Sequence, residues 1–402
     1  MTSLQRNPSY LFAAPTVAVD HRDDGSIILR SPQALQPHAR CAGEYLQQWA
    51  QAAPDRKFLQ ERNAQGGWQG VTYAVALEQV RKIAAWLLRQ NLSAERPVAI
   101  LSDNSVEHSL LMLAAMHIGV PVAPISQAYS MMSKDFAKLK NIFSLIQPGV
   151  VYVSDHKRFA PALDAVKDLH DAIIIAGINT SGGTLPFALM LAETNDTAVD
   201  KAYAAVTPDT IAKFLFTSGS TGEPKGVVNT QRMLCTSQQA KSQVWPFLHD
   251  TPPVIVDWLP WSHTFGGNHN FNLVLKNGGT LYIDAGRPMP GLFEHTIKNL
   301  HDISPTIYFN VPRGYDMLVT ALRNYETLRQ SFFKNLQVIF YAAAALPQNL
   351  WDALEQLSLE TTGEKVSMVS AWGSTETAPL ATDCHFQAEK SGVIGLPVPG
   401  TE

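Results

Sequence analysis

An eleven-residue stretch, Thr217-Ser-Gly-Ser-Thr-Gly-Glu-Pro-Lys-Gly-Val227, gathers three glycines, four hydroxyl side chains and one lysine. Glycines let a backbone approach a ligand closely, and hydroxyls and successive backbone N–H groups donate hydrogen bonds. Together with the positive charge of Lys225, these groups suit a polyphosphate. The stretch is not the common P-loop, whose lysine follows a glycine and precedes Ser or Thr. The alternative is a polar surface turn, which would not require a lysine between Pro224 and Gly226.

Three further loops carry side chains suited to chemistry, and each follows an apolar run that predicts a strand. They are residues 259–269 with His263, residues 341–347 with a run of alanines, and residues 371–378 with Trp372 and Glu376. A flat indole suits stacking, and a carboxylate suits Mg²⁺, which prefers oxygen ligands. Because ligands bind beyond the carboxyl ends of strands in open α/β sheets, we expect these loops to carry a ligand site.

Thr217–Val227 resembles, nearly residue for residue, the phosphate-binding motif of the adenylate-forming superfamily: acyl-CoA synthetases, aryl-CoA ligases, luciferases and adenylation domains of peptide synthetases. The other loops follow in that superfamily's order: a histidine after a Pro-x-x stretch, a loop similar to Gly-Gly-Ala-Pro-Leu, and an aromatic-Gly-x-Thr-Glu motif. The resemblance covers the chain from about residue 40. It implies an α/β fold, the large N-terminal domain of the superfamily, with two covered, mostly parallel sheets, a smaller β-rich subdomain, and no small C-terminal domain.

The resemblance also implies roles for individual residues. The catalytic residues would be Lys225, His263, Thr375 and Glu376, and the metal ligands Glu376 and Thr221. The nucleotide-binding residues would be Thr217, Ser218, Gly219, Ser220, Thr221, Gly222, Lys225, Ala343, Ala344, Trp372, Gly373, Ser374 and Thr375. The acid-binding residues would be His263, Phe265, Asn268, Tyr308, Ala342 and Ala371.

Several of these side chains also have a purely structural interpretation. A lone histidine such as His263 is more often a partly buried, hydrogen-bonded residue, and Tyr308 is equally an ordinary core residue. A turn such as Gly-Ser-Thr-Glu also caps helices. The alanines at positions 342 and 343 stand where the superfamily usually has glycines, and their methyl groups are expected to narrow or reshape a pocket.

The superfamily's reaction has two steps. A carboxylate attacks the α-phosphate of ATP to give an acyl-adenylate and pyrophosphate, and the CoA thiol then displaces AMP. Residues 259–270 and 277–284 look most like those of feruloyl-CoA synthases, which implies a hydroxycinnamic acid substrate with ATP, Mg²⁺ and coenzyme A. A ligase for another aryl or aliphatic acid is an alternative, and so is a non-catalytic nucleotide- or acid-binding module. A hydrolase is disfavoured because the sequence has no Gly-x-Ser-x-Gly motif.

We predict two subdomains. Residues 1–205 would form an α/β subdomain with an N-terminal hairpin, and residues 206–402 a second one that carries the ATP and acid sites. Residues 391–400 resemble the superfamily's next motif. The superfamily then continues with a ribose-binding Asp, a hinge and a small domain with a catalytic lysine, so we expect this chain to be a shortened member.

Two alternating series of strand and helix patterns would position the loops. The first has strands at 98–101, 120–125, 150–153 and 173–175, with helices ending at 118 and covering 134–146 and 157–169. The second has strands at 214–216, 254–258, 280–283, 306–309, 337–340 and 366–370, with helices such as 349–357. A hairpin around Asp23-Asp-Gly25, helices at 41–51 and 74–90 and a strand at 69–73 precede them. Such alternation predicts parallel sheets covered on both faces.

Composition and charge limit the class of protein. A chain of 402 residues that is 46% apolar and 16% charged fits a globular protein of two or three subdomains. A formal charge of −4 with scattered basic residues argues against a nucleic-acid partner. Cys41, Cys235 and Cys384 have neither disulfide nor zinc spacing, which predicts a cytoplasmic protein. No membrane span is predicted, and a homodimer is left open.

Overall fold

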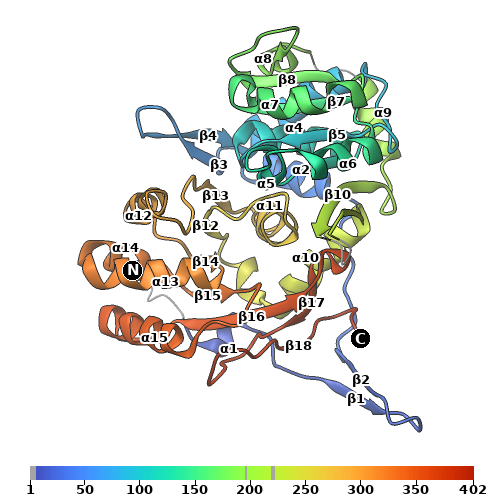
Figure 1. Cartoon of the computed structure of the whole chain (residues 1–402). Helices are drawn as coiled ribbons and strands as arrows, with labels where there is room; N and C mark the ends of the chain where they lie inside the picture. Colours follow the sequence, from blue (N-terminus) through green and yellow to red (C-terminus); the bar gives the residue numbers. More distant parts are fainter. Residues whose placement is uncertain (1–5, 195–196, 219–221) are drawn as a thin grey trace. The chain divides into compact units, whose positions relative to one another are not determined.

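The computed structural model describes residues 6–194, 197–218 and 222–402 (Figure 1). The chain forms two compact units. Unit 1 comprises Met1–His38, Thr236–Leu259 and His269–Glu402, and unit 2 comprises Ala39–Cys235 and Pro260–Asn268. The limits of these units differ from the subdomain boundary that the sequence predicts between residues 205 and 206. That boundary stays a prediction. Within the described ranges, no helix combines the length and the apolar character that crossing a bilayer requires.

Unit 2 is built on a large sheet. Its described strands run in the order β11 (Pro224–Thr230), β10 (Ile211–Ser218), β6 (Val122–Pro124), β5 (Val98–Leu101), β7 (Val150–Asp155), β8 (Ile173–Ile178) and β9 (Leu185–Pro186). All neighbours pair in parallel except β10 and β11, which pair antiparallel at the sheet edge. The strands predicted in the first series are confirmed, and so is the α/β class.

Helices α6 (Ala137–Ile146) and α7 (His156–Val166) cover one face of this sheet, where their apolar side chains form a single buried cluster with those of β5 to β8. The buried residues of α6 are Leu139, Ile142, Phe143 and Ile146. Their spacing places them on one face of a helix. This periodicity is the sequence signal that predicts the helix.

Two other helices of unit 2 begin after a hydroxyl residue that caps their first turn. Helix α3 (Tyr73–Leu87) begins after Thr72, whose hydroxyl accepts a hydrogen bond from the Val75 N–H. Helix α4 (Val106–His117) begins after Ser105, whose hydroxyl accepts from the His108 N–H. Such caps satisfy N–H groups that have no partner in the first turn.

The remaining elements of unit 2 include one strand that the sequence does not reveal. Strand β3 (Lys57–Arg62) pairs antiparallel with the predicted strand β4 (Trp68–Thr72). The other elements are α2 (Ala42–Ala52), α5 (Gln127–Ser130), η1 (Lys167–Leu169), α8 (Ala188–Leu191) and α9 (Thr197–Ala205). The segment between β8 and β10 thus contains short elements of its own, namely β9, α8 and α9.

A buried histidine at the end of α4 makes the stability of unit 2 depend on pH. His117 is 2% exposed, its ring stacks on that of Tyr203 at 4.2 Å, and neither ring nitrogen has a hydrogen-bond partner among the described residues. Burial lowers the pKa of His117 to about 4. Between that value and the ordinary 6.5, the unfolded chain binds a proton that the folded chain does not, so stability falls as the pH falls.

We expect His117→Phe to weaken this dependence, because phenylalanine keeps the ring contact and cannot titrate. On moving from about pH 7.5 to about pH 5, the wild type should lose about 2 kcal/mol more unfolding free energy than the variant. Urea unfolding at the two pH values measures this difference. The same substitution at the exposed His301 should leave the wild-type dependence unchanged. Equal losses in the wild type and His117→Phe would contradict the assignment.

Unit 1 contains a second sheet, whose described strands run in the order β14 (Ile307–Asn310), β15 (Val338–Tyr341), β16 (Ser367–Gly373), β17 (Leu380–Asp383) and β18 (Leu396–Pro397). The first three are parallel, and β17 and β18 continue the sheet antiparallel. Strands β12 (Val254–Asp257) and β13 (Thr280–Ile283) form a further parallel pair in this unit. The prediction at 280–283 is confirmed residue for residue, and the others are shifted by one to three residues.

The predicted N-terminal hairpin is confirmed as β1 (Ala18–His21) and β2 (Ile27–Arg30), which pair antiparallel in unit 1. The helices of unit 1 include α1 (Pro8–Leu11), η2 (Pro246–His249), α11 (Phe271–Lys276), α12 (Phe293–Asp302), α13 (Pro312–Asn324), α14 (Glu326–Lys334), α15 (Gln348–Thr362) and η4 (Thr375–Thr377). Two more helices cross the sequence boundaries between the units: α10 (Gln231–Val244) and the π-helix η3 (Phe265–Asn270).

Candidate functional site

The predicted phosphate loop lies at the end of the β10–β11 hairpin of unit 2. Thr217 pairs with Lys225 across the two strands, and Ser218 pairs with Pro224. The Lys225 side chain is exposed, and Gly222 has a φ of +85°, a conformation that favours glycine. The loop therefore joins two antiparallel strands. Gly219, Ser220 and Thr221 lie outside the described residues, so their predicted roles stay predictions.

Gly226 shows why a glycine follows the lysine. A Cβ atom on Gly226 would lie 3.3 Å from the ring of Phe216, its partner on β10. That distance is tighter than an ordinary van der Waals contact, so a side chain here would push against the Phe216 ring. Glycine at position 226 thus lets β11 lie close to the Phe216 ring of β10 directly after the exposed Lys225.

His263 lies in the loop before η3, and its side chain is exposed. Its Nδ1 accepts a hydrogen bond of 3.2 Å from the Phe265 N–H. A neutral His263 therefore carries its proton on Nε2, where it is available to donate. Phe265 is 7% exposed and Asn268 is fully buried, so these two predicted acid-binding residues line the interior of unit 2 rather than its surface.

Contacts within unit 2 hold the part of the π-helix η3 that carries Phe265 and Asn268. A Cβ atom on Gly267 would lie 2.3 Å from the carbonyl oxygen of Trp261, so this position requires glycine. The Asn268 amide donates to Asn229 Oδ1 at 2.8 Å and to Thr264 Oγ1 at 3.1 Å. Short π-helical segments occur frequently at functional sites. The arrangement fixes the backbone that follows His263.

Lys213 is a buried group near this segment that the sequence reasoning misses. It is fully buried on β10, and its ammonium group donates a 2.8 Å hydrogen bond to the Gly267 carbonyl of η3. Burial lowers the pKa of Lys213 to about 7. A sequence signal exists, because Lys213 directly precedes the apolar run 214–216 and a lysine is unusual in a buried strand. Lys213 thus ties the strand before the phosphate loop to the segment that follows His263.

In unit 1 most of the predicted residues lie at or beyond the carboxyl ends of parallel strands. Tyr308 is an exception, because it lies within β14 and is 1% exposed. Its ring contacts Tyr315 and Phe332 edge-on, and its hydroxyl accepts a hydrogen bond from the Asn310 amide. This is the environment of a core residue, so the acid-binding role of Tyr308 stays a prediction.

The alanine loop after β15 explains why glycines are usual there. Ala343 has a φ of +72°, in the left-handed region that costs a non-glycine residue about 1–2 kcal/mol. Ala343 and Ala344 are exposed, and Ala342 is half-buried. The left-handed backbone at Ala343 is therefore enough to favour glycine there. No effect of the alanine methyl groups on a pocket is needed to explain it.

The end of β16 and the turn after it present the other predicted nucleotide-binding residues. Trp372 is 56% exposed, Thr375 is buried and Glu376 is exposed. A Cβ atom on Gly373 would lie 1.5 Å from the Pro379 carbonyl oxygen, so only glycine fits. The Ser374 N–H donates to Thr377 Oγ1 at 2.9 Å and closes the short helix η4. The turn therefore forms the capped beginning of η4. The exposed Trp372 indole precedes η4, and the exposed Glu376 carboxylate lies in it. Ala371 precedes them on β16.

The exposed Glu376 carboxylate has the donor chemistry for Mg²⁺. Within the described ranges, no three His, Cys, Asp or Glu side chains gather into a metal-binding group. Mg²⁺ is commonly held by one or two carboxylates together with substrate phosphates rather than by a protein cage. A single exposed carboxylate beside Thr375 fits that mode of binding.

Comparison with known proteins covers most of the chain. Residues 46–402 match the family described as AMP-binding enzyme. The oxalate–CoA ligase of Arabidopsis thaliana is 26% identical over 357 residues, and 4-coumarate–CoA ligase 2 of Oryza sativa subsp. japonica is 27% identical over 352 residues. These alignments cover 88% and 83% of this chain, but 65% and 58% of the relatives. The chain thus spans less than two thirds of the length of either relative.

Solved structures show the same fold. The chain is similar to an anthranilate CoA ligase in complex with anthranoyl-AMP, with a TM-score of 0.72, 18% identity, and coverage of 91% of this chain and 66% of that one. It is also similar to the luciferase-like enzyme of the mealworm Zophobas morio, with a TM-score of 0.71, 18% identity, and coverage of 92% and 82%. At this identity the similarity concerns the fold alone.

Proposed function

The chain belongs to the AMP-binding enzyme family, and from this membership we propose that it activates a carboxylic acid with ATP and passes the acyl group to coenzyme A. In the first step a carboxylate oxygen attacks the α-phosphorus of ATP, and pyrophosphate leaves. In the second step the CoA thiol attacks the acyl carbon, and AMP leaves. The observation that carries the proposal is the β10–β11 hairpin, which presents the exposed Lys225 beside Thr217.

The chemistry of the first step explains the residue types. The step brings two anions together, so it requires positive charge and hydrogen-bond donors along the triphosphate. We assign Lys225 and the hairpin end to the β- and γ-phosphates, and Thr375 to a phosphate oxygen. Glu376 would hold Mg²⁺, which supplies charge neutralisation when bound. The exposed Trp372 indole offers a face for the adenine.

For the acid, we propose a hydroxycinnamate such as ferulate. The support is the resemblance of residues 259–270 and 277–284 to feruloyl-CoA synthases, together with a relative named 4-coumarate–CoA ligase. Another relative is named oxalate–CoA ligase, so a different acid is the alternative outcome. His263, in the loop before η3, and Phe265, the first residue of η3, belong to unit 2 and would contact the acid.

Mass spectrometry of acyl-AMP tests this function. The chain is incubated with ATP, Mg²⁺ and one acid at a time from a set of ferulate, benzoate and hexanoate. We expect feruloyl-AMP with equimolar pyrophosphate release. Formation of another acyl-AMP alone would overturn the hydroxycinnamate assignment and keep the reaction. Binding of AMP in a calorimeter without acyl-AMP from any acid would favour a non-catalytic binding module instead.

A further inference from the structure

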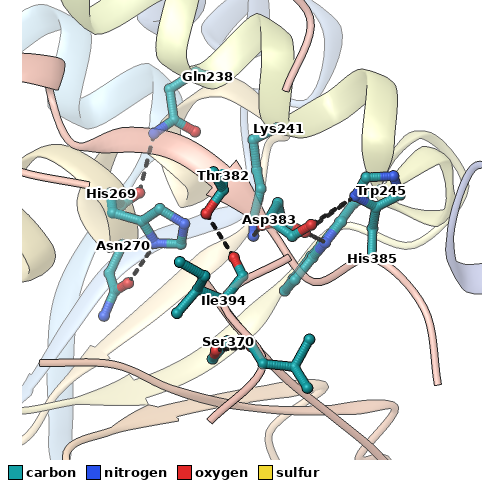
Figure 2. Close-up of polar contacts among 11 residues, drawn as sticks. Gln238, Lys241, Trp245, His269, Asn270, Ser370, Thr382, Asp383, His385 and Ile394 are labelled. Carbon is teal, nitrogen blue, oxygen red and sulfur yellow. Dashed lines mark hydrogen bonds and ion pairs between the residues drawn. The ribbon is translucent and has the colours of Figure 1, made fainter. Parts of the chain in front are cut away.

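A buried ion pair in unit 1 lies beside the two strands whose ends carry the predicted nucleotide-binding residues. Lys241 of α10 is 1% exposed and Asp383 of β17 is fully buried, and their Nζ and Oδ2 atoms lie 2.5 Å apart. The Trp245 indole N–H donates to the other carboxylate oxygen at 2.9 Å. Figure 2 shows these three side chains converging on one point.

Aromatic rings enclose the ammonium group of Lys241. Its Nζ lies 3.4 Å from the centroid of the Trp245 ring and 4.7 Å from that of Phe340. Phe340 also stacks on His269 at 5.2 Å. Burial and the positive charge of Lys241 lower the pKa of His269 to about 3, so His269 adds no second positive charge near neutral pH.

Stability alone is a weak explanation for such a pair. Removing two charges from water costs about as much as their attraction returns, and well-packed apolar residues often replace a buried pair without loss of stability. A buried, fully partnered pair does, however, select one arrangement of the elements that it joins. The role of this pair therefore depends on the segments that it holds in place.

The pair connects α10 to β17, the strand that follows the turn and pairs with β16. Asp383 lies opposite Ala371 in the pairing of β17 with β16, and the Cys384 N–H donates to the Ser370 carbonyl at 2.8 Å. Trp372 lies near the end of β16, and Thr375 and Glu376 lie in the connection between β16 and β17. On the other side, Phe340 lies on β15 just before the alanine loop.

We propose that Lys241 and Asp383 are positioning residues that hold the turn between β16 and β17 in the conformation that binds the nucleotide. The inference rests on the proposed function, because the turn's role in binding ATP belongs to that proposal. Neither residue need touch a substrate. The pair fixes Asp383, the last residue of the short strand β17, and the turn is joined to Leu380, the first residue of that strand.

Steady-state kinetics distinguish positioning from a general loss of stability. In Lys241→Met and in Asp383→Asn, we expect the KM for ATP in pyrophosphate exchange to rise about tenfold, because small displacements of binding groups have large effects. The KM for the acid should change less than about threefold. The matched control is Thr296→Val, which removes a buried hydrogen bond of 2.6 Å to Asp284 in the same unit. It should lower the melting temperature without changing the ratio of the two KM values.

A double variant tests the proposal in case the single variants Lys241→Met and Asp383→Asn unfold. Lys241→Met/Asp383→Leu replaces the pair by apolar side chains, and we expect its melting temperature to recover while the KM for ATP stays raised. Wild-type KM values in the folded double variant, or equal increases in both KM values in the single variants, would overturn the inference.

Calorimetry with AMP separates this inference from the proposed function. If the wild type binds AMP but forms no acyl-AMP, the proposed reaction is wrong. In that case, about tenfold weaker AMP binding by both single variants would still support the positioning role. Unchanged AMP binding in folded single variants would overturn the positioning role even if the wild type is an active ligase. A wild type that binds no AMP would overturn both.

Discussion

Glu376→Gln is expected to reduce the rate of acyl-adenylate formation about 10²–10³-fold, the usual effect of removing one preorganised charge from a transition state. The glutamine keeps the size of the side chain and removes the negative charge that would hold Mg²⁺. Because Glu376 is exposed at the turn after β16, the melting temperature should stay within about 1–2 °C of the wild type. Pyrophosphate exchange at saturating ATP and acid measures the rate.

The control for this prediction is Glu389→Gln, which removes the same charge from another exposed glutamate of unit 1 and should leave the rate unchanged. A second comparison varies the concentration of Mg²⁺. If Glu376 holds the ion, the variant should need more Mg²⁺ for half-maximal rate than the wild type. Exchange at the wild-type rate in Glu376→Gln would remove the assigned role.

Lys225→Met should have an effect of similar size, about 10²–10³-fold in the rate with ATP. Methionine keeps most of the length of the side chain, so the change removes the ammonium charge that would neutralise the triphosphate. Its backbone pairing with Thr217 needs no lysine side chain, and the hairpin should therefore remain. Binding of AMP, which lacks the β- and γ-phosphates, should weaken much less than binding of ATP.

This difference between ATP and AMP makes the Lys225 prediction specific. Lys140→Met is the matched control, because Lys140 is an exposed lysine of the same unit. Lys225→Arg keeps the charge with a different shape, so it should retain more activity than Lys225→Met. Equal weakening of AMP and ATP binding in Lys225→Met would place the lysine away from the β- and γ-phosphates.

Much of the fold follows from local patterns. The apolar runs at 98–101 and 280–283 predict β5 and β13 residue for residue, because strands covered on both faces are apolar throughout. The pattern fails for β11, where Pro224, Gly226 and Asn229 are poor strand formers. That strand forms because it pairs with β10 at a sheet edge, where a proline without an N–H is tolerated.

The sequence predicts which residue types make up the candidate site. It predicts less well their backbone conformations and their contact partners. The four loops are visible in the sequence because glycines, hydroxyls, a lysine, an indole and a carboxylate occur together. Conformation at individual positions is not visible, as the left-handed Ala343 shows. The partners of Lys213 and Lys241 come from the tertiary fold: Lys241 and Asp383 are separated by 142 residues. No local pattern indicates such a pair.

The edge position of β11 has a consequence for how the protein behaves in concentrated solution. An edge strand presents unpaired N–H and C=O groups to which a strand of another molecule can add, and natural proteins commonly block such edges with proline and lysine. Pro224 and Lys225 occupy this edge. We therefore expect the Lys225 charge also to oppose aggregation through the hairpins of separate molecules, and a charged replacement should preserve that protection where methionine would lose it.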